Sequence, residues 1–448
     1  MDFKVFKEAV VNAANELGIK EYELYYSSSE GTSVGVFKDE VNEFSSSVNG
    51  GACFRCIVNG KMGYASTEEL SAEQAESIVK RAADNAAVLE NDDKQFLVAG
   101  GEKYEPLELK PYALPTTEEM IKTALEAQKA LYAADPAVID GTSTSVDVAK
   151  ETINIFNSNG LDLHYENSMA MLLAAPVVTD GSEMSNKYDF KTGPLSEMDL
   201  KELADNTVKK AKDMLGADVA PTGNYHVVFA PEAMTSLLGV YSGIFNSENA
   251  QKGLSRLLGK EGEKIAADIV SIIDDPFYKD SSMPINFDGE GSPTRCKSVV
   301  ENGYLKTLLY NLKTAHIAGV ETTGNASKAG YASGVGIRPF TFYIAPGSMT
   351  EEELLKEAGS GVYITDLGGL HAGANPISGD FSLQSSGFMI EDGKKTKAVK
   401  SFTVSGNFYS LLKQITALSN EVKLPRPFGI TSFGSPTVLV EGLTVAGK

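Results

Sequence analysis

The chain has 448 residues and a mass of 47.8 kDa. A single core stops growing at roughly 250–300 residues, so we expect two domains. A formal charge of −20 disfavours direct nucleic-acid binding, which depends on Lys and Arg side chains that neutralise phosphates. The sequence lacks an apolar signal core and the ~18-residue apolar run of a membrane span. Three cysteines are too few for a disulfide framework, and we expect a soluble, cytoplasmic protein.

The N-terminal quarter begins with an amphipathic helical pattern from Phe3 to Leu17, followed by Gly18 as a C-terminal cap. The period then changes, and short β-prone runs follow at Glu23–Ser27, Ser33–Phe37, Val41–Val48, Ala52–Val58 and Met62–Ser66. Asn59-Gly60 has the composition of a two-residue hairpin turn. The region is therefore predicted to be a β-meander.

The next segment alternates between helix and strand signals. Capping-box patterns begin at Ser71 and Thr116, and the second helix is predicted to end at Asp135-Pro136. Strands are predicted at Ser143–Asp147, Thr152–Asn157 and Leu161–Ala175, with a turn at Asn159-Gly160, and a helix from Ser196 to about Gly216. We expect two of these helices to cover a sheet.

A composition break at Gly216–Gly223 separates a charged helix from an apolar strand, and we place a domain boundary there. The predicted domains are residues 1–220 and 221–448. The second half contains helical patterns at Pro231–Phe245 and Gly253–Ile272, and hairpin signals at Asn302-Gly303 and Asp392-Gly393. Because βαβ spacing is absent, we predict an α+β fold with antiparallel or mixed sheets, flanking helices and a mainly β C-terminal domain.

Several short motifs are better explained by structure than by chemistry. Cys53 and Cys56 have C-x-x-C spacing, but they lie in a predicted strand, where residues three apart point to opposite faces. Gly31–Gly35 matches G-x-S-x-G, yet a strand follows it where a hydrolase needs a helix. The four histidines are isolated from one another, and the sequence contains no H-E-x-x-H.

The stretch from Gly368 to Ser382 is dense in glycine and small polar residues. We expect neither a regular helix nor a central strand there. Such a loop exposes backbone donors and lets another chain approach closely, so a binding role is one interpretation and a purely structural loop is the other. His371 lies within this stretch and is the histidine most suited to a functional role.

The segment Asn375–Phe388 reads N-P-I-S-G-D-F-S-L-Q-S-S-G-F and resembles the N-P-V-S-G-D-F-S-x-x-x-S-G-F signature of the TldD/PmbA family. Further resemblances lie at Phe287–Thr294, Glu301–Lys306, Asn157–Leu161 and Gly442–Gly447, so the similarity extends over nearly the whole chain.

One branch of that family, the TldD branch, carries H-E-x-x-x-H on a helix and a distal cysteine, which together hold zinc, while the glutamate acts as general base. In an approximate alignment, the first histidine, the glutamate and the second histidine fall near Gly239, Val240 and Ile244 of this chain, in that order. No cysteine follows Cys296. The resemblance therefore favours the PmbA (TldE) branch, and we expect this chain to hold no metal and no cofactor.

What the resemblance implies is a subunit without a metal site that pairs with a TldD-type zinc peptidase subunit. In the family, the complex cleaves extended or unfolded peptides, including antibiotic-peptide leaders and antitoxins, and the related name modulator of DNA gyrase does not require a DNA-binding surface. We expect a homodimer or heterodimer with no direct nucleic-acid or membrane partner. The candidate peptide contacts are His371, Asn375, Ser378 and Asp380.

Two alternatives remain open. The first is a hydrolase with a site around His371 that uses Asp380 and a nearby serine. The second is a homodimeric, peptide-binding scaffold without catalysis.

Overall fold

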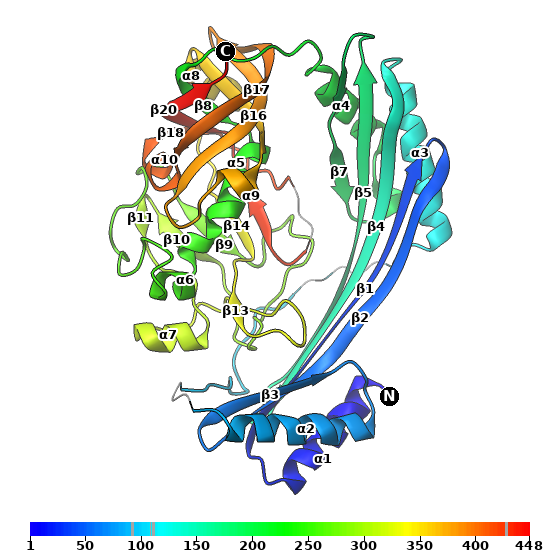
Figure 1. Ribbon diagram of the computed structural model, residues 1–448, viewed down its shortest axis with the longest axis vertical. Helices are drawn as coiled ribbons and strands as arrows, with labels where there is room; N and C mark the ends of the chain where they lie inside the picture. Colours follow the sequence, from blue (N-terminus) through cyan, green and yellow to red (C-terminus); the bar gives the residue numbers. More distant parts are fainter. Residues whose placement is uncertain (91–93, 108, 110–112, 426–428) are drawn as a thin grey trace.

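The computed structural model describes residues 1–90, 94–107, 109, 113–425 and 429–448 (Figure 1). It is an α+β structure with antiparallel and mixed sheets and flanking helices, which confirms the predicted fold class. Among the described residues, no helix is both long enough and apolar enough to cross a membrane.

A seven-stranded antiparallel sheet forms the N-terminal part. Its strands are β1 (Glu21–Phe37), β2 (Glu40–Val58), β3 (Lys61–Thr67), β4 (Val138–Asn157), β5 (Asp162–Thr179), β6 (Met184–Asn186) and β7 (Asp189–Thr192). Their order is β3-β2-β1-β4-β5-β6, and β7 also pairs with β5. The four longest strands have 17 to 20 residues and extend for roughly 60 Å at about 3.3 Å per residue. They form the long curved ribbon in Figure 1.

The predicted meander is present, but its short runs are parts of three longer strands. Ser27–Ser33 is rich in Ser and Gly, which favours a break, yet β1 is paired with β2 on one side and β4 on the other throughout this stretch. Hydrogen bonding to a neighbouring strand on each side outweighs the low strand propensity of the Gly and Ser residues in this stretch. The Asn59-Gly60 turn is confirmed, with φ values of 52° and 77°.

Four helices cover one face of this sheet. They are α1 (Phe3–Glu16), α2 (Ala72–Ala87), α3 (Thr117–Ala134) and α4 (Leu200–Lys212). On β1, Leu24 packs against α1 and α2 and Val34 against α3 and α4, and these even-numbered residues share a face. Tyr25 points to the other face, where it packs against segments of the C-terminal part.

The predicted helix start at Ser196 is wrong. Ser196 lies in a 3₁₀ turn, η1 (Leu195–Glu197), and α4 begins later because the Asp199 side chain accepts a hydrogen bond from the Glu202 N–H at 2.9 Å. An N-cap carboxylate satisfies one of the free N–H groups of the first turn and fixes the helix start there.

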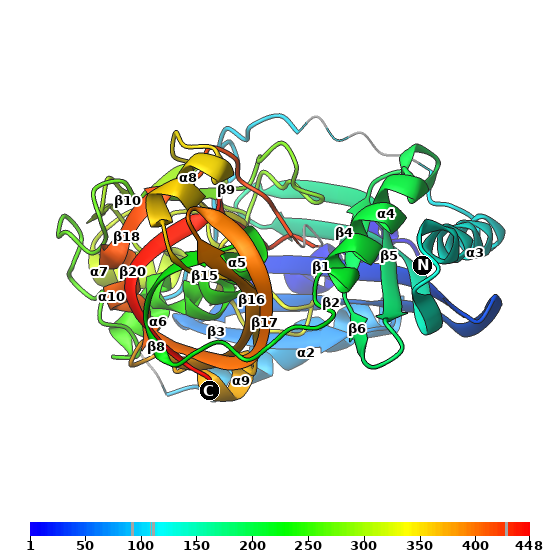
Figure 2. The same ribbon diagram turned by 90° about the horizontal axis from the view of Figure 1, so that it is seen from above.

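The C-terminal part is built around a ring of five strands. These are β8 (Gly223–Phe229), β15 (Gly361–Gly368), β16 (Asp380–Glu391), β17 (Lys394–Asn407) and β20 (Val438–Ala446). The ring closes because β17 pairs with both β16 and β20, and β18 (Ile415–Leu418) extends it at β20. Figure 2 looks along the ring, with α5 (Pro231–Tyr241) inside its outline.

The remaining elements surround this ring. They are η2 (Ser242–Phe245), α6 (Ser247–Gln251), β9 (Ile272–Asp275), β10 (Lys297–Glu301), β11 (Tyr304–Leu305), α7 (Leu312–Ala318), β12 (Ala326–Ser327), β13 (Gly336–Ile337), β14 (Thr341–Ile344), α8 (Glu351–Ala358), α9 (Leu370–Gly373), α10 (Phe408–Gln414) and β19 (Ser432–Gly434). The second sheet has the order β11-β10-β9-β14-β19, and β12 pairs with β13. The hairpins predicted at Asn302-Gly303 and Asp392-Gly393 are confirmed.

The helical pattern predicted for Gly253–Ile272 is wrong. The segment consists of turns, and its last residue begins β9. Gly253, Gly259 and Gly262 adopt φ values of 74°, 68° and 86°, so the chain reverses direction repeatedly in a conformation that interrupts a helix. The division into residues 1–220 and 221–448 remains our proposal for the domain boundary.

Candidate functional site

A cleft of about 790 Å³ lies between the N-terminal sheet and the ring of the C-terminal part. One wall comes from the segment before β7, from β7, and from α4 with the turn after it. The other wall comes mainly from α5 and β15, with further residues from α8, β16, β17, the segment before β19 and β19 itself. The cleft is lined by Lys187, Tyr188, Asp189, Phe190, Lys210, Asp213, Met214, Ala230, Pro231, Glu232, Thr235, Ser236, Gly239, Val240, Glu351, Tyr363, Thr365, Asp366, Leu367, Leu370, Phe388, Lys395, Lys423, Pro425 and Phe433.

Helix α5 positions one wall of this cleft. It begins with Pro231, whose fixed φ suits the first helical residue. Ala233, Met234 and Leu237 turn into the C-terminal core, and the opposite side lines the cleft. Gly239 faces the ring of Phe433, which lies 3.5 Å from where a β-carbon would stand. This wall of the cleft is therefore apolar at its centre.

Ion pairs join the two walls. Lys187, before β7, reaches Asp366 on β15 at 2.5 Å. Lys210 on α4 contacts Asp189 at 2.8 Å and Glu232 of α5 at 3.6 Å. Burial opposes the charge of Lys210, but its bonds to these two carboxylates raise its pKa above the ordinary value. The cleft thus carries charged groups that are already paired around an apolar centre.

A second polar group lies where α8 and β17 meet. Glu351 accepts hydrogen bonds from Lys395 Nζ at 2.8 Å and from Thr437 Oγ1 at 3.0 Å. Burial works to raise the pKa of Glu351, but the bond to Lys395 outweighs it and the pKa is lowered. The Lys395 ammonium also lies 3.8 Å from the centroid of the Tyr363 ring, at a distance suited to a cation–π contact.

The cleft residues do not fit a zinc ion. Gly239 and Val240 line it, whereas Ile244 is buried in the core within η2, and none of the three has a donor atom on its side chain. From the distal segment, Pro425 and Phe433 reach the cleft. In the part of the chain that the structure describes, no three His, Cys, Asp or Glu residues gather in a way that could hold a metal.

Three of the sequence-predicted contacts are brought together in one turn before β16. Asn375 Oδ1 accepts from the N–H groups of Ile377 and Ser378 at 3.0 and 3.1 Å. Asn407 Nδ2 donates to Asp380 Oδ1 at 2.8 Å, and this bond contributes most to a lowered pKa of Asp380. These side chains are used to shape the turn, and none of the three lines the cleft.

His371 lies apart from that turn, exposed on the one-turn helix α9, and its neighbour Leu370 lines the cleft. The composition of Gly368–Ser382 predicts neither a regular helix nor a central strand, but α9 occupies four of these residues and β16 begins at Asp380. Among the hydrogen bonds of the described residues, none joins His371 to Asp380, so a triad is not formed here.

A buried charged cluster joins the two parts of the chain, and sequence reasoning missed it. Arg55 on β2 and Glu23 on β1 form a two-pronged ion pair at 2.7 and 2.9 Å. Lys328, from the C-terminal part, places its ammonium 4.1 Å from the centroid of the Tyr25 ring. Burial lowers the pKa of Lys328. The sequence signal for this cluster is the Phe287–Thr294 motif, because its Glu290 carboxylate acts on the charge of Arg55.

Within that motif, two carboxyl groups lie close together. Asp288 accepts hydrogen bonds from three backbone N–H groups, those of Glu290, Ser292 and Ala326, each at 2.9 Å. Burial and then the neighbouring Glu290 carboxylate raise the pKa of Asp288 to about 7. The arrangement orders the loop that packs against β1 and β2.

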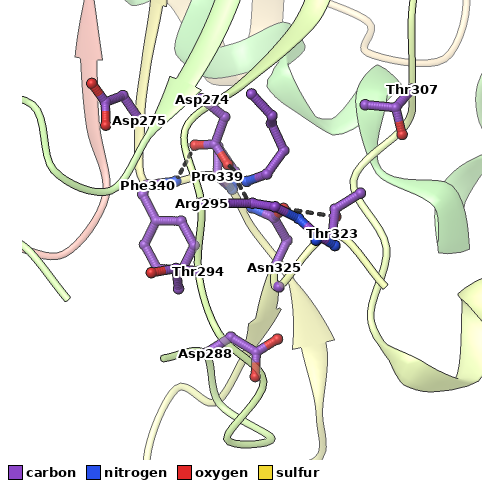
Figure 3. A network of polar contacts seen from close by, with 12 residues as sticks. Asp274, Asp275, Asp288, Thr294, Arg295, Thr307, Thr323, Asn325, Pro339 and Phe340 are labelled. Atoms are coloured by element: carbon purple, nitrogen blue, oxygen red, sulfur yellow. Dashed lines mark hydrogen bonds and ion pairs between the residues drawn. The ribbon is translucent and has the colours of Figure 1, made fainter. Parts of the chain in front are cut away.

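Figure 3 shows a further network, centred on the fully buried Asp274 of β9. Its carboxylate accepts from Phe340 N at 2.7 Å, Asn325 Nδ2 at 2.7 Å and Lys297 Nζ at 2.9 Å. These partners come from three different segments, so the buried charge is compensated and the segments are fixed relative to one another.

The chain is similar to known proteins over nearly its whole length. Residues 22–86, 110–215 and 222–447 match, in order, domain 1, the central domain and the C-terminal domain of the PmbA/TldA metallopeptidases. The Metalloprotease PmbA of Escherichia coli O157:H7 is 25% identical over 459 residues, which span 99% of this chain and 97% of that protein.

Two solved structures are similar over the same length. A Thermotoga maritima protein, provisionally described as a modulator of a DNA gyrase, is 30% identical with a TM-score of 0.90 and covers 99% of this chain and 100% of its own. TldE from Thermococcus kodakarensis is 26% identical with a TM-score of 0.88 and covers 98% and 100%. The predicted resemblance is confirmed, and the chain belongs to the PmbA/TldD family.

Proposed function

We propose that this chain is the PmbA/TldE-type subunit of a TldD/TldE-type peptidase system that acts on extended or unfolded peptides, and that it contributes no metal site. The likeness to Metalloprotease PmbA and to TldE over nearly the whole chain supports the kind of subunit. The observation that carries the proposal is helix α5, which lines the cleft with Gly239 and Val240. These are two of the positions onto which the approximate alignment puts the zinc motif of the TldD branch.

Zinc, where a TldD-type partner holds it, would polarise the scissile carbonyl and activate a water molecule. This chain offers no imidazole, thiolate or free carboxylate at the corresponding helix. Its contribution is to bind and orient peptide. In the cleft, Glu232 and Asp189 are both engaged by Lys210, so they are not placed to act as a general base.

The cleft suits an extended chain better than a folded one. Strand β7 is an edge strand paired only with β5, and Asp189 and Phe190 of this strand line the cleft. An edge strand offers backbone groups to a peptide without regard to its sequence, and neighbouring apolar side chains such as Phe388 can receive alternate residues. His371, Asn375, Ser378 and Asp380 remain proposed peptide contacts, although none of them lines the cleft itself.

The test measures cleavage of an unstructured fluorogenic peptide by a zinc-bearing family chain, with and without this protein. The Val240→Arg variant places a charge in the apolar wall of the cleft, and Val88→Arg, at the exposed end of α2, is the matched control. We expect the wild-type protein to increase cleavage and Val240→Arg to raise KM about tenfold, which corresponds to about 1.4 kcal/mol.

Two results would contradict the proposal. One is cleavage by the zinc-bearing chain that is unchanged when this protein is added. The other is equal kinetics for Val240→Arg and Val88→Arg, which would show that the peptide does not enter the cleft. Binding of labelled peptide to the lone chain, measured for both variants, separates loss of peptide binding from loss of pairing with the partner.

A further inference from the structure

Nearly every charge that lines the cleft is already paired. Its five carboxylates each contact a lysine: Asp366 contacts Lys187, Asp189 and Glu232 contact Lys210, Glu351 contacts Lys395, and Asp213 contacts Lys209 of α4. Three of the four lysines in the lining take part in these pairs. The fourth, Lys423, belongs to none of the ion pairs formed among the described residues.

The backbone directs the Lys423 side chain toward the cleft. Lys423 and Ser435 exchange two backbone hydrogen bonds, at 3.0 and 3.1 Å. The side chains of Val422 and Leu424 come within 3.1 and 3.5 Å of the position that a β-carbon on Gly434 would take, so they lie on one side of the segment. Successive side chains of an extended segment point to opposite sides, and Lys423 accordingly lines the cleft.

Lys423 lies near a second lysine and one carboxylate. Glu351 accepts hydrogen bonds from Lys395 Nζ at 2.8 Å and from Thr437 Oγ1 at 3.0 Å, so each of its two carboxylate oxygens already has a donor. Burial opposes the charge of Glu351, but Lys395, Thr437 and then the charge of Lys423 lower its pKa. Two ammonium groups therefore share this end of the cleft with one carboxylate, and one positive charge is left over.

The opposite imbalance occurs elsewhere in the cleft. Lys210 is shared by Asp189 at 2.8 Å and Glu232 at 3.6 Å, so one ammonium group serves two carboxylates there. The excess of positive charge is therefore local to Lys423 and Lys395, on a chain whose formal charge is −20. Such a chain repels an acidic ligand as a whole, so a preference for an acidic ligand requires a local site of this kind.

We propose that Lys423 and Lys395 bind a carboxylate of the peptide that enters the cleft. This site deepens the proposed function and rests on it, because it names a chemical group that the bound peptide carries. Two sources offer the same group, namely an Asp or Glu side chain and the C-terminal carboxylate of the peptide.

A carboxylate fits this position because it completes the pairing without breaking an existing ion pair. An ammonium group has three N–H donors, and Lys395 uses one of them for Glu351. Phe433 and Pro425 line the same cleft, and apolar neighbours reduce the screening of a charge pair by water. A basic side chain at this position would face two ammonium groups and would be repelled.

The experiment measures the binding of three labelled, unstructured peptides to the purified chain by fluorescence anisotropy. The first peptide carries one glutamate and an amidated C-terminus, the second has glutamine in place of the glutamate, and the third is the glutamine peptide with a free C-terminal carboxylate. We expect the first, the third or both to bind about fivefold more tightly than the second, as a single partly exposed ion pair allows. The peptide that binds more tightly identifies the source of the carboxylate.

Variants of Lys423 assign the preference to this site. Lys423→Gln should bring the dissociation constants of the three peptides within about twofold of one another, whereas Lys423→Arg keeps the charge and should keep the preference. Lys413→Gln is the matched control, since Lys413 is exposed on α10 and does not line the cleft. The control should bind the three peptides as the wild-type chain does.

Two results would overturn the carboxylate site alone. One is equal binding of the three peptides to the wild-type chain, while Val240→Arg weakens the binding of all three. The other is a preference for a carboxylate that Lys423→Gln leaves unchanged. Failure of every peptide to bind the wild-type chain would instead remove the proposed function, and the carboxylate site with it.

Discussion

At the scale of single residues, one buried ion pair, between Glu23 and Arg55, carries its own compensating charges. Glu23 and Arg55 are almost fully buried and lie on neighbouring strands, with both carboxylate oxygens occupied by the guanidinium group. Burial opposes the positive charge of Arg55, but Glu23 more than compensates, and the pKa of Arg55 is raised. The Arg55 guanidinium is therefore held in its charged form by its partner on the neighbouring strand.

Removing one partner leaves the other charge buried. We predict that Glu23→Ala lowers the free energy of unfolding by about 3–5 kcal/mol, because Arg55 then lacks its carboxylate. The double variant Glu23→Leu/Arg55→Met carries neither charge and should be closer to the wild type. Urea titration of the three proteins is the measurement, and equal losses in the single and double variants would contradict this account.

The carboxyl pair Asp288 and Glu290 predicts a dependence of stability on pH. The pKa of Asp288 is raised to about 7 in the folded chain, so the folded state holds a proton that the unfolded state releases near pH 4. The contribution of Asp288 to the free energy of unfolding is therefore fully present below pH 4. It falls as the pH rises toward 7 and changes little above pH 7. Each tenfold change in proton affinity corresponds to about 1.4 kcal/mol.

Glu290→Gln removes the neighbouring negative charge and retains an oxygen that can accept from the Leu312 N–H. We predict a lower pKa for Asp288 in this variant and a shallower fall of the melting temperature between pH 4 and 7. Thermal unfolding of wild-type and variant chains across that range checks it. An unchanged slope would show that Asp288 and Glu290 do not interact as described.

At the scale of elements, close approach between a strand and a helix depends on one glycine. A β-carbon on Gly63 of β3 would lie 1.9 Å from the Ala82 carbonyl oxygen of α2 and 2.5 Å from the Ala86 nitrogen. Backbone atoms cannot move aside as a flexible side chain can. The packing of α2 on β3 therefore requires glycine at this position.

We predict that Gly63→Ala destabilises the protein by about 1–3 kcal/mol or more through overpacking. Gly330→Ala is the control, because a β-carbon there meets nothing within 4 Å, and its effect should stay within about 1 kcal/mol. The measurement is the urea concentration at the unfolding midpoint of each variant, compared with that of the wild-type chain. Equal midpoints for the two variants would mean that α2 can shift away from the strand at little cost.

Elements with a local chemical signal were predictable from the sequence. The Thr116 capping box is present in the structure, with reciprocal bonds to Glu119, and the Asn59-Gly60 turn joins β2 to β3. The prediction for Gly253–Ile272 failed because hydrophobic spacing in that segment serves an irregular chain that packs on the C-terminal core. Local patterns cannot distinguish these two cases.

At the scale of the whole molecule, the family motif was recognisable but the cleft was not. Its walls come from segments far apart in the chain, such as Asp189, Lys210, Glu232 and Asp366, and no spacing rule links them. The turn at Asn375–Asp380 is recognisable as a motif, yet its side chains bond to the backbone of the turn and to Asn407. Which side chains a motif uses for its own structure becomes visible only in three dimensions.

The ion pairs across the cleft lie near the surface, so each is worth little and is screened by salt. The two parts of the chain are joined more firmly at the buried cluster around Arg55 and Lys328. We predict that charge reversal at Lys187 changes the melting temperature by less than about 2 °C, since exposed pairs contribute about 0–1 kcal/mol. If charge reversal at Lys187 lowered the melting temperature as much as Glu23→Ala does, the view that the surface ion pairs are weaker than the buried cluster would be contradicted.

The most direct test of the central claim is the zinc content and proteolytic activity of the lone chain, purified without chelator and then supplied with zinc. Because helix α5 offers Gly239 and Val240 where ligands would be needed, we predict zinc well below one ion per chain and no chelator-sensitive cleavage of an unfolded peptide. One tightly held zinc ion per chain, together with proteolysis that a chelator abolishes, would contradict it.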